Sequence, residues 1–287
     1  MYVIEVPTLD LQTIVRSGQG FGWKRLPGTN MKKYLVQFGE HAAKVEQFDN
    51  RLCIGCNDDD FYNVWYPYFD LSTDYQELRS KAVQMGGEVR NWAMRYSGLH
   101  CLKMPLYEAC IASCLWRNCS YYWARCMFST LCEQVGENDS IRIQGVGKYE
   151  FKKIPGVLDL LSNGDVILRV CGSEIGGWLL ELLEGIFDGW LDFGFLQKLP
   201  YKNAVDYLAP FIGSNEAARA LMWAGWDDAK PVTVDYDTLA VWDYACESIE
   251  DFEEWYLHGF SKNSYLQHLR VLDRRSKDEK EWDWLTT

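Results

Sequence analysis

The first 75 residues differ from the rest of the chain in their hydrophobic pattern. In "YLVQFGEHAAKVEQFDNRLCIGC" (34–56), apolar positions alternate with polar ones, and Gly, Asn and Asp interrupt the alternation. A period of two predicts half-buried β-strands, and the interruptions predict the turns between them. We therefore expect an antiparallel β-rich domain over residues 1–78.

From about residue 76, apolar residues recur every three or four positions, which is the period of an amphipathic helix. The stretches "DYQELRSKAVQMGGEVRNWAMRYSG", "PLYEACIASCLWRN" and "SYYWARCMFSTLCEQVG" all have this pattern. A β-hairpin is expected at 141–154, a helix–turn–helix at about 203–225, and further helices near 237–257 and 262–275. The predicted fold class is α+β: a small antiparallel sheet followed by a larger, all-helical domain over 79–287.

The composition favours a globular protein with a large core. Of the 287 residues, 48% are hydrophobic and 15% aromatic, which argues against disorder. No apolar run reaches the roughly 20 residues that a membrane span needs. The start "MYVIEVPTLD" has no basic region followed by an apolar stretch, so we expect no secretory signal. We expect a monomer in the cytoplasm of a prokaryote or of a virus-infected cell.

The ten cysteines do not predict disulfides or a metal centre. Five of them fall in a helical apolar pattern, where a reduced thiol acts as a small core side chain: Cys110, Cys114, Cys119, Cys126 and Cys132. Cys53 and Cys56 form a lone CxxC with no second ligand pair nearby, and no four-cysteine cluster suits an iron–sulfur centre. A phosphate-binding loop of the form GxxxxGK[ST] is also absent, so we expect no cofactor.

The net charge of −12 argues against strong non-specific DNA binding, because phosphate contacts come from Lys and Arg. A local basic face is still compatible with this charge. Basic residues gather in "RIQGVGKYEFKK" (142–153) and between Arg79 and Arg95. Each group is either such a face or an ordinary solvated surface.

Four segments, taken in order, resemble the 8-oxoguanine DNA glycosylases of the helix-hairpin-helix superfamily. They are "LDLQTIVRSGQGFGWKR", "DDFYNVWYPYFDLSTDYQEL", "GLHCLKMPLYEACIASCLWRN" and "PFIGSNEAARALMWAGWDDAKPVTVD". The resemblance is collinear over roughly residues 1–275. It implies a cleft between the two domains, with DNA across it and one nucleotide flipped out. Backbone N–H groups of the hairpin would hold a phosphate, and in family members the hairpin carbonyls can hold a monovalent cation.

Asp235, in "VTVDYD", matches the catalytic aspartate of the family. Breaking an N-glycosidic bond develops positive charge on the sugar, and a nearby carboxylate stabilises that charge or activates water. Asp is also a preferred N-cap, and Asp235 precedes a helical stretch, so both roles are compatible.

Asn215 stands where many members carry a nucleophilic lysine. An amide cannot form a Schiff base, so the covalent, strand-nicking route is closed at this position. Asn215 either orients the attacking water or is merely a tolerated helix residue. Phe211 replaces the first glycine of the hairpin while Gly213 keeps the second, and a bulky side chain there would restrict positive φ and close approach to a phosphate.

The resemblance also implies residues that recognise the flipped base. Gly18 matches a glycine whose carbonyl reads the oxidised purine, and Gln267 matches a glutamine that reads the Watson–Crick edge. Val271 replaces a sandwiching aromatic ring, which weakens stacking. Arg219 stands where the family has a cysteine, and could stack on a base, pair with a carboxylate such as Asp235, or crowd the pocket. The simpler interpretations are a turn glycine and solvated helix residues.

Asn118, in "WRNCS", matches the asparagine that fills the space beside the orphaned partner base. In "CGSEIGGW", Ile175 and Gly176 replace the aromatic wedge and arginine of the family, and Glu174 adds a negative charge. An apolar wedge can still open a base step. Loss of the arginine removes recognition of the opposite base.

Two functions are compatible with these residues. The first is a monofunctional DNA glycosylase that removes a modified base, expected to be a purine, using water and Asp235. The second is a catalytically silent relative that binds DNA or another protein, which the net acidity, Phe211 and Glu174 favour.

Overall fold

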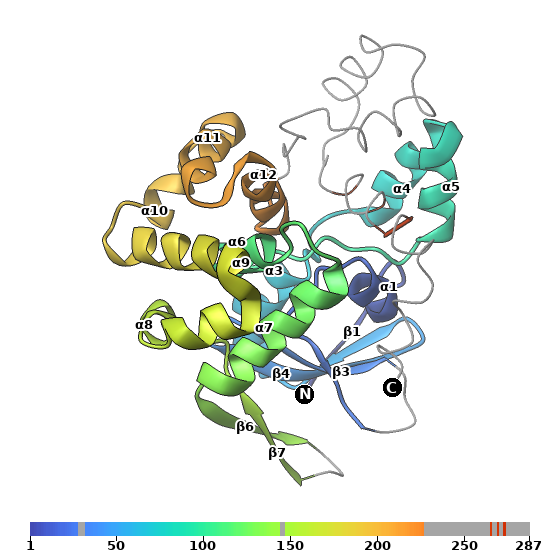
Figure 1. Ribbon diagram of the computed structural model, residues 1–287. Helices are drawn as coiled ribbons and strands as arrows, with labels where there is room; N and C mark the ends of the chain where they lie inside the picture. Colours follow the sequence, from blue (N-terminus) through green and yellow to red (C-terminus); the bar gives the residue numbers. More distant parts are fainter. Residues whose placement is uncertain (28–31, 144–146, 227–264, 266–268, 270–271, 274–287) are drawn as a thin grey trace.

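The structure is a computed structural model that describes residues 1–27, 32–143 and 147–226, together with positions 265, 269, 272 and 273 (Figure 1). Its N-terminal part holds a five-stranded antiparallel sheet in the order β1-β5-β4-β3-β2. The strands are β1 (Tyr2–Glu5), β2 (Lys24–Arg25), β3 (Lys33–Phe38), β4 (His41–Phe48) and β5 (Arg51–Ile54). The predicted β-rich start of the chain is confirmed.

The register of the sheet places apolar residues opposite one another. Val45 in β4 pairs with Tyr34 on one side and with Ile54 on the other, and all three are buried. The helix α1 (Leu11–Arg16) packs Leu11 and Ile14 into the same core. Asp10 begins α1 as an N-cap that accepts from the backbone N–H of Gln12 at 2.8 Å.

Three short elements follow the sheet as a compact helical segment that is rich in aromatic residues. They are α2 (Asp58–Asp60), the π-helical turn η1 (Phe61–Trp65) and α3 (Tyr66–Tyr68). Tyr68 stacks on Phe38 of β3, with ring centroids 3.7 Å apart. Most of the aromatic side chains of "DDFYNVWYPYFDLS" therefore pack into the core of the β domain.

Two helices, α4 (Tyr75–Gln84) and α5 (Gly87–Arg95), lead out of this region. The predicted domain boundary at residues 78/79 falls inside α4. Residues 98–105 then run back between the two parts of the molecule. Along this connection, Lys103 N–H donates to the carbonyl of Tyr68, and Met104 N–H donates to the carbonyl of Trp223, each at 2.9 Å.

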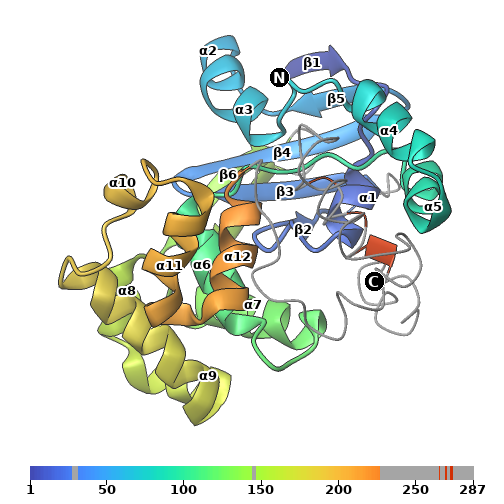
Figure 2. The ribbon, with the colours of Figure 1, turned by 90° about the horizontal axis from the view of Figure 1, so that it is seen from above.

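The helical body is built around α6 (Leu106–Leu115), in which nine of the ten residues are buried. A helix that is buried on all sides belongs in the centre of a domain. Figure 2 shows the later helices grouped around it. They are α7 (Tyr121–Val135), α8 (Val157–Leu161), α9 (Gly164–Phe187), α10 (Phe193–Leu196), α11 (Tyr201–Ile212) and α12 (Ser214–Trp223).

Of the five cysteines in the expected helical pattern, Cys110, Cys114 and Cys132 are buried in helices, Cys126 of α7 is partly buried, and Cys119 lies in the loop between α6 and α7. Cys110 and Cys114 are buried in α6, and all nine cysteines within the described residues are free thiols. In the same part of the chain, no three His, Cys, Asp or Glu side chains gather as a metal site would require. None of the helices described is long and apolar enough to cross a membrane.

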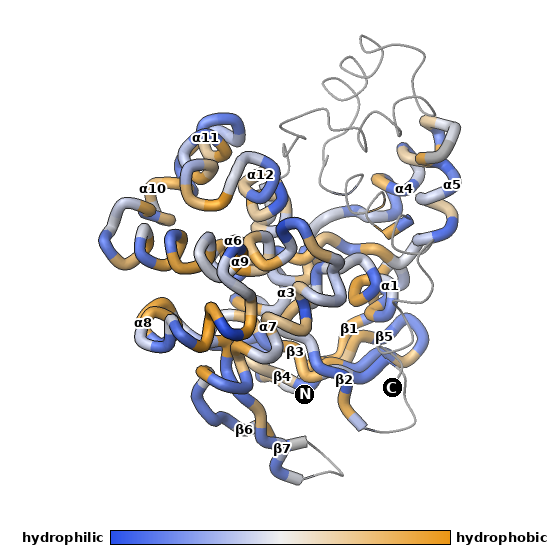
Figure 3. Tube along the Cα trace, viewed as in Figure 1, coloured by the Kyte–Doolittle hydropathy of each residue, from blue (hydrophilic) through white to orange (hydrophobic). Residues whose placement is uncertain are grey.

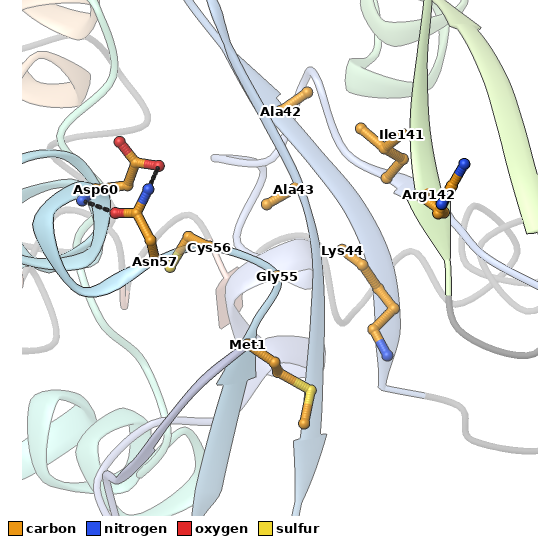
Figure 4. Close-up of a pocket in the computed structure, with 10 residues that line it drawn as sticks. All are labelled: Met1, Ala42, Ala43, Lys44, Gly55, Cys56, Asn57, Asp60, Ile141 and Arg142. Atoms are coloured by element: carbon orange, nitrogen blue, oxygen red, sulfur yellow. Dashed lines mark hydrogen bonds between the residues drawn. The ribbon is translucent and has the colours of Figure 1, made fainter.

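The predicted β-hairpin consists of β6 (Asn138–Ile143) and β7 (Gly147–Lys152). Ile141, Tyr149 and Phe151 pack against Leu26 and Leu35 of the β domain, while the far part of the hairpin is hydrophilic (Figure 3). A depression of about 560 Å³ lies between the hairpin and β4, with Lys44 and Arg142 on its wall (Figure 4).

A buried glutamate connects the two parts of the molecule. Glu108 of α6 is 3% exposed, and its carboxylate accepts a hydrogen bond from the Gly39 N–H in the β3–β4 turn. Burial raises the pKa of Glu108 from 4.5 to about 8, and the bond from Gly39 opposes the rise only in part.

The turn between α11 and α12 is a single residue, Gly213, with φ 87° and ψ 154°. Side chains on a Cβ are strained at such a φ. A Cβ here would also lie 2.7 Å from Oε2 of Glu216 and 3.1 Å from Nη1 of Arg117. Gly213 is therefore required both by its backbone conformation and by its surroundings.

The raised pKa of Glu108 predicts a pH-dependent stability. The contribution of protonated Glu108 to the free energy of unfolding is fully present below the unfolded pKa of 4.5. It is lost as the pH rises towards about 8, because the unfolded chain releases this proton before the folded protein does. One pKa unit corresponds to 1.36 kcal/mol, so the loss in the free energy of unfolding is on the order of 5 kcal/mol. Urea unfolding should show this loss in the wild type and a flatter pH dependence in Glu108→Gln, which keeps the acceptor for Gly39. The exposed Glu184→Gln is the control, and an unchanged pH slope in Glu108→Gln contradicts the assignment.

The conformation of Gly213 predicts that Gly213→Ala lowers the free energy of unfolding by about 1–3 kcal/mol. Gly177 provides a matched control, because it lies inside α9 and a Cβ there meets no atom within 4 Å. Gly177→Ala should stabilise the protein by up to about 1 kcal/mol through helix propensity. Denaturant unfolding of both variants measures the difference, and shifts of the same sign would refute this interpretation of the turn.

Candidate functional site

Three elements meet where α6 ends: the α11–α12 hairpin, the α6–α7 loop and the bend in α9. The loop carries "WRN" (116–118): Trp116 contacts α12, Arg117 contacts α11 and α9, and Asn118 contacts α9. Figure 2 shows α12 beside α6 and α11, which agrees with the packing of α12 on both helices.

Trp116 joins the end of α6 to α12. Its ring stacks on Trp223 with centroids 5.6 Å apart and an interplanar angle of 8°. Phe21, from the loop before β2, lies 5.6 Å from Trp223, and Tyr121 contacts both Phe21 and Trp116. We call Phe21, Trp116, Tyr121 and Trp223 the aromatic cluster. It brings the β domain, the loop and the hairpin helix into one apolar contact.

Arg219 lies against the same loop. Its guanidinium is 4.9 Å from the Trp116 ring centroid and donates to the Trp116 carbonyl at 3.4 Å. Nη2 is 3.7 Å from Oε1 of Glu216. Burial lowers the pKa of Arg219, and Glu216 opposes that change. The predicted alternatives of base stacking, pairing with Asp235 and crowding of the pocket therefore start from an arginine that is already held by protein groups.

Asn215 is exposed in the first turn of α12, two residues after Gly213. Ala217 and Ala220 on the same helix are fully buried, so α12 turns its apolar face to the core. Arg219 follows Asn215 by one helical turn, as the spacing of four predicts. The structure thus puts Asn215 on the accessible side of the hairpin. Its water-orienting role stays a prediction.

Asn118 is exposed and has φ 53°, a left-handed conformation that asparagine tolerates better than most residues. Its Nδ2 donates to Oε1 of Glu174 at 3.4 Å. Glu174 follows a bend in α9 at Gly172, where φ is 77° and ψ is 170°. This contact brings the α6–α7 loop to the bent part of α9.

The expected wedge role of Ile175 and Gly176 stays a prediction. Ile175 is partly buried and packs against the helical core, and Gly176 is buried, where a Cβ would lie 3.1 Å from Leu168. Glu174 is the described side chain that reaches Asn118. Glu174 lies two residues after the bend at Gly172, on the part of α9 that contacts the α6–α7 loop.

Arg117 was not singled out by the sequence, yet it contacts two elements. Its guanidinium carbon is 3.9 Å from the ring centroid of Trp178 in α9, and Nη1 donates to the Ile212 carbonyl at 3.2 Å. The signal that could have identified it is an arginine at the end of a helix that is otherwise almost wholly apolar, directly before Asn118.

Gly18 lies in a buried loop that is fixed from two sides. Its φ is 92°, which explains the glycine as a turn residue. The side chain of the next residue, Gln19, donates to the His100 carbonyl at 3.0 Å and accepts from the Leu102 N–H at 2.6 Å. Arg125 of α7 donates to the carbonyls of Gly20 and Trp23. The base-reading role of Gly18 stays a prediction.

Phe211 does not lie in the hairpin turn. It belongs to the last part of α11, and its ring packs against Gly185 of α9, where a Cβ would lie 2.5 Å from Cε1 of Phe211. The positive φ falls on Gly213 alone, so the expected restriction of the turn by Phe211 is wrong. Asp235, Gln267 and Val271 lie outside the described residues.

The two basic groups of the sequence are largely engaged in surface contacts. On the β6–β7 hairpin, Lys148 pairs with Glu150 at 2.8 Å, and Lys153 lies 3.6 Å from Glu40 and 3.7 Å from Asp139. In the helical stretch, Lys81 pairs with Glu77 at 2.8 Å. These contacts favour the solvated-surface interpretation over a dedicated basic face.

Comparison with known proteins agrees with this geometry. The family model for the N-terminal domain of 8-oxoguanine DNA glycosylase matches residues 1–110. No curated protein matches the sequence. The structure is similar to the 8-oxoguanine glycosylase/lyase of Clostridium acetobutylicum in complex with double-stranded DNA that contains cytosine opposite 8-oxoG. The TM-score is 0.80 at 18% identity, covering 97% of this chain and 99% of that one.

Two further structures share the fold. One is MBOgg1 in complex with a low-affinity DNA ligand, with a TM-score of 0.78, 16% identity and 96% coverage of both chains. The other is 3-methyladenine DNA-glycosylase from Archaeoglobus fulgidus, with a TM-score of 0.69, 14% identity, and coverage of 96% of this chain and 99% of that one. Residues 1–110 of this chain thus match the N-terminal domain of 8-oxoguanine DNA glycosylase, and the chain shares the fold of these DNA glycosylases.

Proposed function

We propose that this protein is a monofunctional DNA glycosylase, which binds DNA and hydrolyses the N-glycosidic bond of a modified base. The observation that carries the proposal is the preserved hairpin, with Gly213 at its turn and Asn215, which has no amine, exposed on the next helical turn. The N-terminal domain match and the DNA-bound structural neighbours support binding to DNA.

The proposed reaction needs no covalent enzyme intermediate. The bond between the base nitrogen and C1′ breaks, its electron pair leaves with the base, and positive charge develops on the sugar. The Asp235 carboxylate stabilises this charge and accepts a proton from the water that attacks C1′. The departing base takes up a proton, and the product is an abasic site in an intact strand. Asn215 donates or accepts a hydrogen bond that orients the water.

We propose a modified purine as the substrate, read by Gly18 and Gln267. The opposite base should matter little. The residue beside Asn118 is the acidic Glu174, which cannot make the bidentate contact of an arginine with guanine. A glycosylase with these residues should act on its base with little regard for the partner strand.

A silent DNA- or protein-binding role remains the second candidate. The observation that favours it is the closed contact of Arg219 with Trp116 and Glu216, which occupies one wall beside Asn215. In such a protein the hairpin would be a binding surface, and the Asp235 carboxylate would serve only the fold.

Base release tests the proposal directly. Purified protein is incubated with single strands and duplexes that carry 8-oxoguanine, alkylated purines or uracil, and strand breaks are counted with and without alkali. We expect breaks only after alkali. Asp235→Asn should slow release by at least about a hundredfold, the usual effect of removing a catalytic acid or base. Retained DNA binding without release in the wild type would support the silent role instead.

Replacing Asn215 by lysine tests where the sugar lies. If Asn215 faces C1′, the amine of Asn215→Lys can attack that carbon and form a Schiff base. Borohydride should then trap a covalent protein–DNA adduct, and strands should break without alkali. Ser214→Lys, one residue earlier on the same turn, is the matched control. Equal trapping by both variants, or by neither, would place C1′ away from Asn215.

A further inference from the structure

Arg117 connects parts of the site that the sequence keeps far apart. Nη1 donates to the carbonyl of Ile212, the last residue of α11, at 3.2 Å. The next residue is Gly213, where a Cβ would lie 3.1 Å from the same nitrogen. The guanidinium therefore lies directly against the hairpin turn that presents Asn215.

The other face of the guanidinium rests on α9. Its carbon is 3.9 Å from the centroid of the Trp178 ring, which is a close cation–π contact. Trp178 follows Glu174 by four residues, so both lie on one face of the helix beyond the bend at Gly172. Neighbouring loop residues thus reach neighbouring positions of α9: Arg117 at Trp178, and Asn118 at Glu174.

The Ile212 carbonyl that Arg117 binds also attracts a positive charge, because it lies at the C-terminal end of α11. The last carbonyls of a helix have no partner within the helix and carry its partial negative charge. A planar guanidinium can stack on a ring and donate to a carbonyl at once, which a lysine ammonium cannot do. Glu216 offers no alternative donor to that carbonyl, since a carboxylate only accepts.

We propose that Arg117 is a positioning residue that fixes the hairpin turn, and with it Asn215, relative to the bent half of α9. The inference rests on the proposed glycosylase function for its catalytic consequence. When the guanidinium is removed, the Ile212 carbonyl loses its donor and the turn is free to shift against the loop. Base removal requires Asn215 to be correctly placed relative to the sugar. The rate of base removal should therefore fall by a larger factor than the affinity for DNA.

Chemical rescue distinguishes positioning from a general loss of stability. Arg117→Ala leaves a space between Trp178 and the Ile212 carbonyl that free guanidinium can fill at non-denaturing concentrations. We expect the single-turnover rate of base release to fall about tenfold or more, with DNA affinity changed by less than about threefold. Guanidinium chloride should restore part of the rate, and potassium chloride at the same ionic strength should not. Arg117→Lys should remain slow.

Two controls complete the test. Arg169→Ala removes an exposed arginine of α9 that faces Asp165 at 3.9 Å and donates to Oε1 of Gln134 at 3.1 Å, and it should leave the rate unchanged. Trp178→Leu removes the ring. It should lower the rate of base release in the protein that keeps Arg117, and it should abolish the rescue of Arg117→Ala by guanidinium. A wild-type rate in Arg117→Ala, or a loss that guanidinium never restores, overturns the proposal.

Hydrogen exchange at Gly213–Asn215 separates this inference from the proposed function. Faster exchange at these amides in Arg117→Ala, reversed by guanidinium, would establish the positioning contact even if no substrate were cleaved. Failure of the glycosylase proposal would instead show as an inactive wild type with this exchange difference intact. Unchanged exchange at the turn would overturn the inference itself.

Discussion

The stacking of Trp116 on Trp223 sets the geometry on which the candidate site depends. It holds the end of the buried helix α6 against α12, with centroids 5.6 Å apart. The loop that leaves α6 must then pass beside the hairpin. Its next two residues, Arg117 and Asn118, consequently reach the hairpin carbonyl and the bent helix α9.

The chemistry of the site depends on the charged side chains that lie beside the hairpin and the α6–α7 loop. Arg219 is paired with Glu216 and lies over Trp116, so its charge is largely used inside the protein. Glu174 brings a negative charge to the loop. With a net charge of −12 on the whole chain, the DNA binding that we propose would depend on specific contacts at the hairpin more than on non-specific contacts to phosphates. A hydrolytic reaction at one flipped base suits such a surface better than tight, non-specific binding.

Hydrophobic periodicity was enough to predict the sheet and the helical body, since each depends on local spacing, whereas the hairpin was located by the resemblance. The resemblance did not anticipate the bend of α9 at Gly172, after which Glu174 reaches Asn118. It also misplaced Phe211, whose ring faces Gly185, a residue distant in sequence. Arg117 was missed because its partners are distant as well. Long-range contacts decide these positions, and one sequence does not display them.

The central claim is that the hairpin removes a base without an amine. Mass spectrometry of the small molecules released from chemically damaged DNA tests it most directly, because no substrate has to be chosen in advance. The account predicts one free modified base, released in equal number to new abasic sites, and no covalent protein–DNA adduct. Bound DNA with no base released, or an adduct trapped on the wild-type protein, would contradict it.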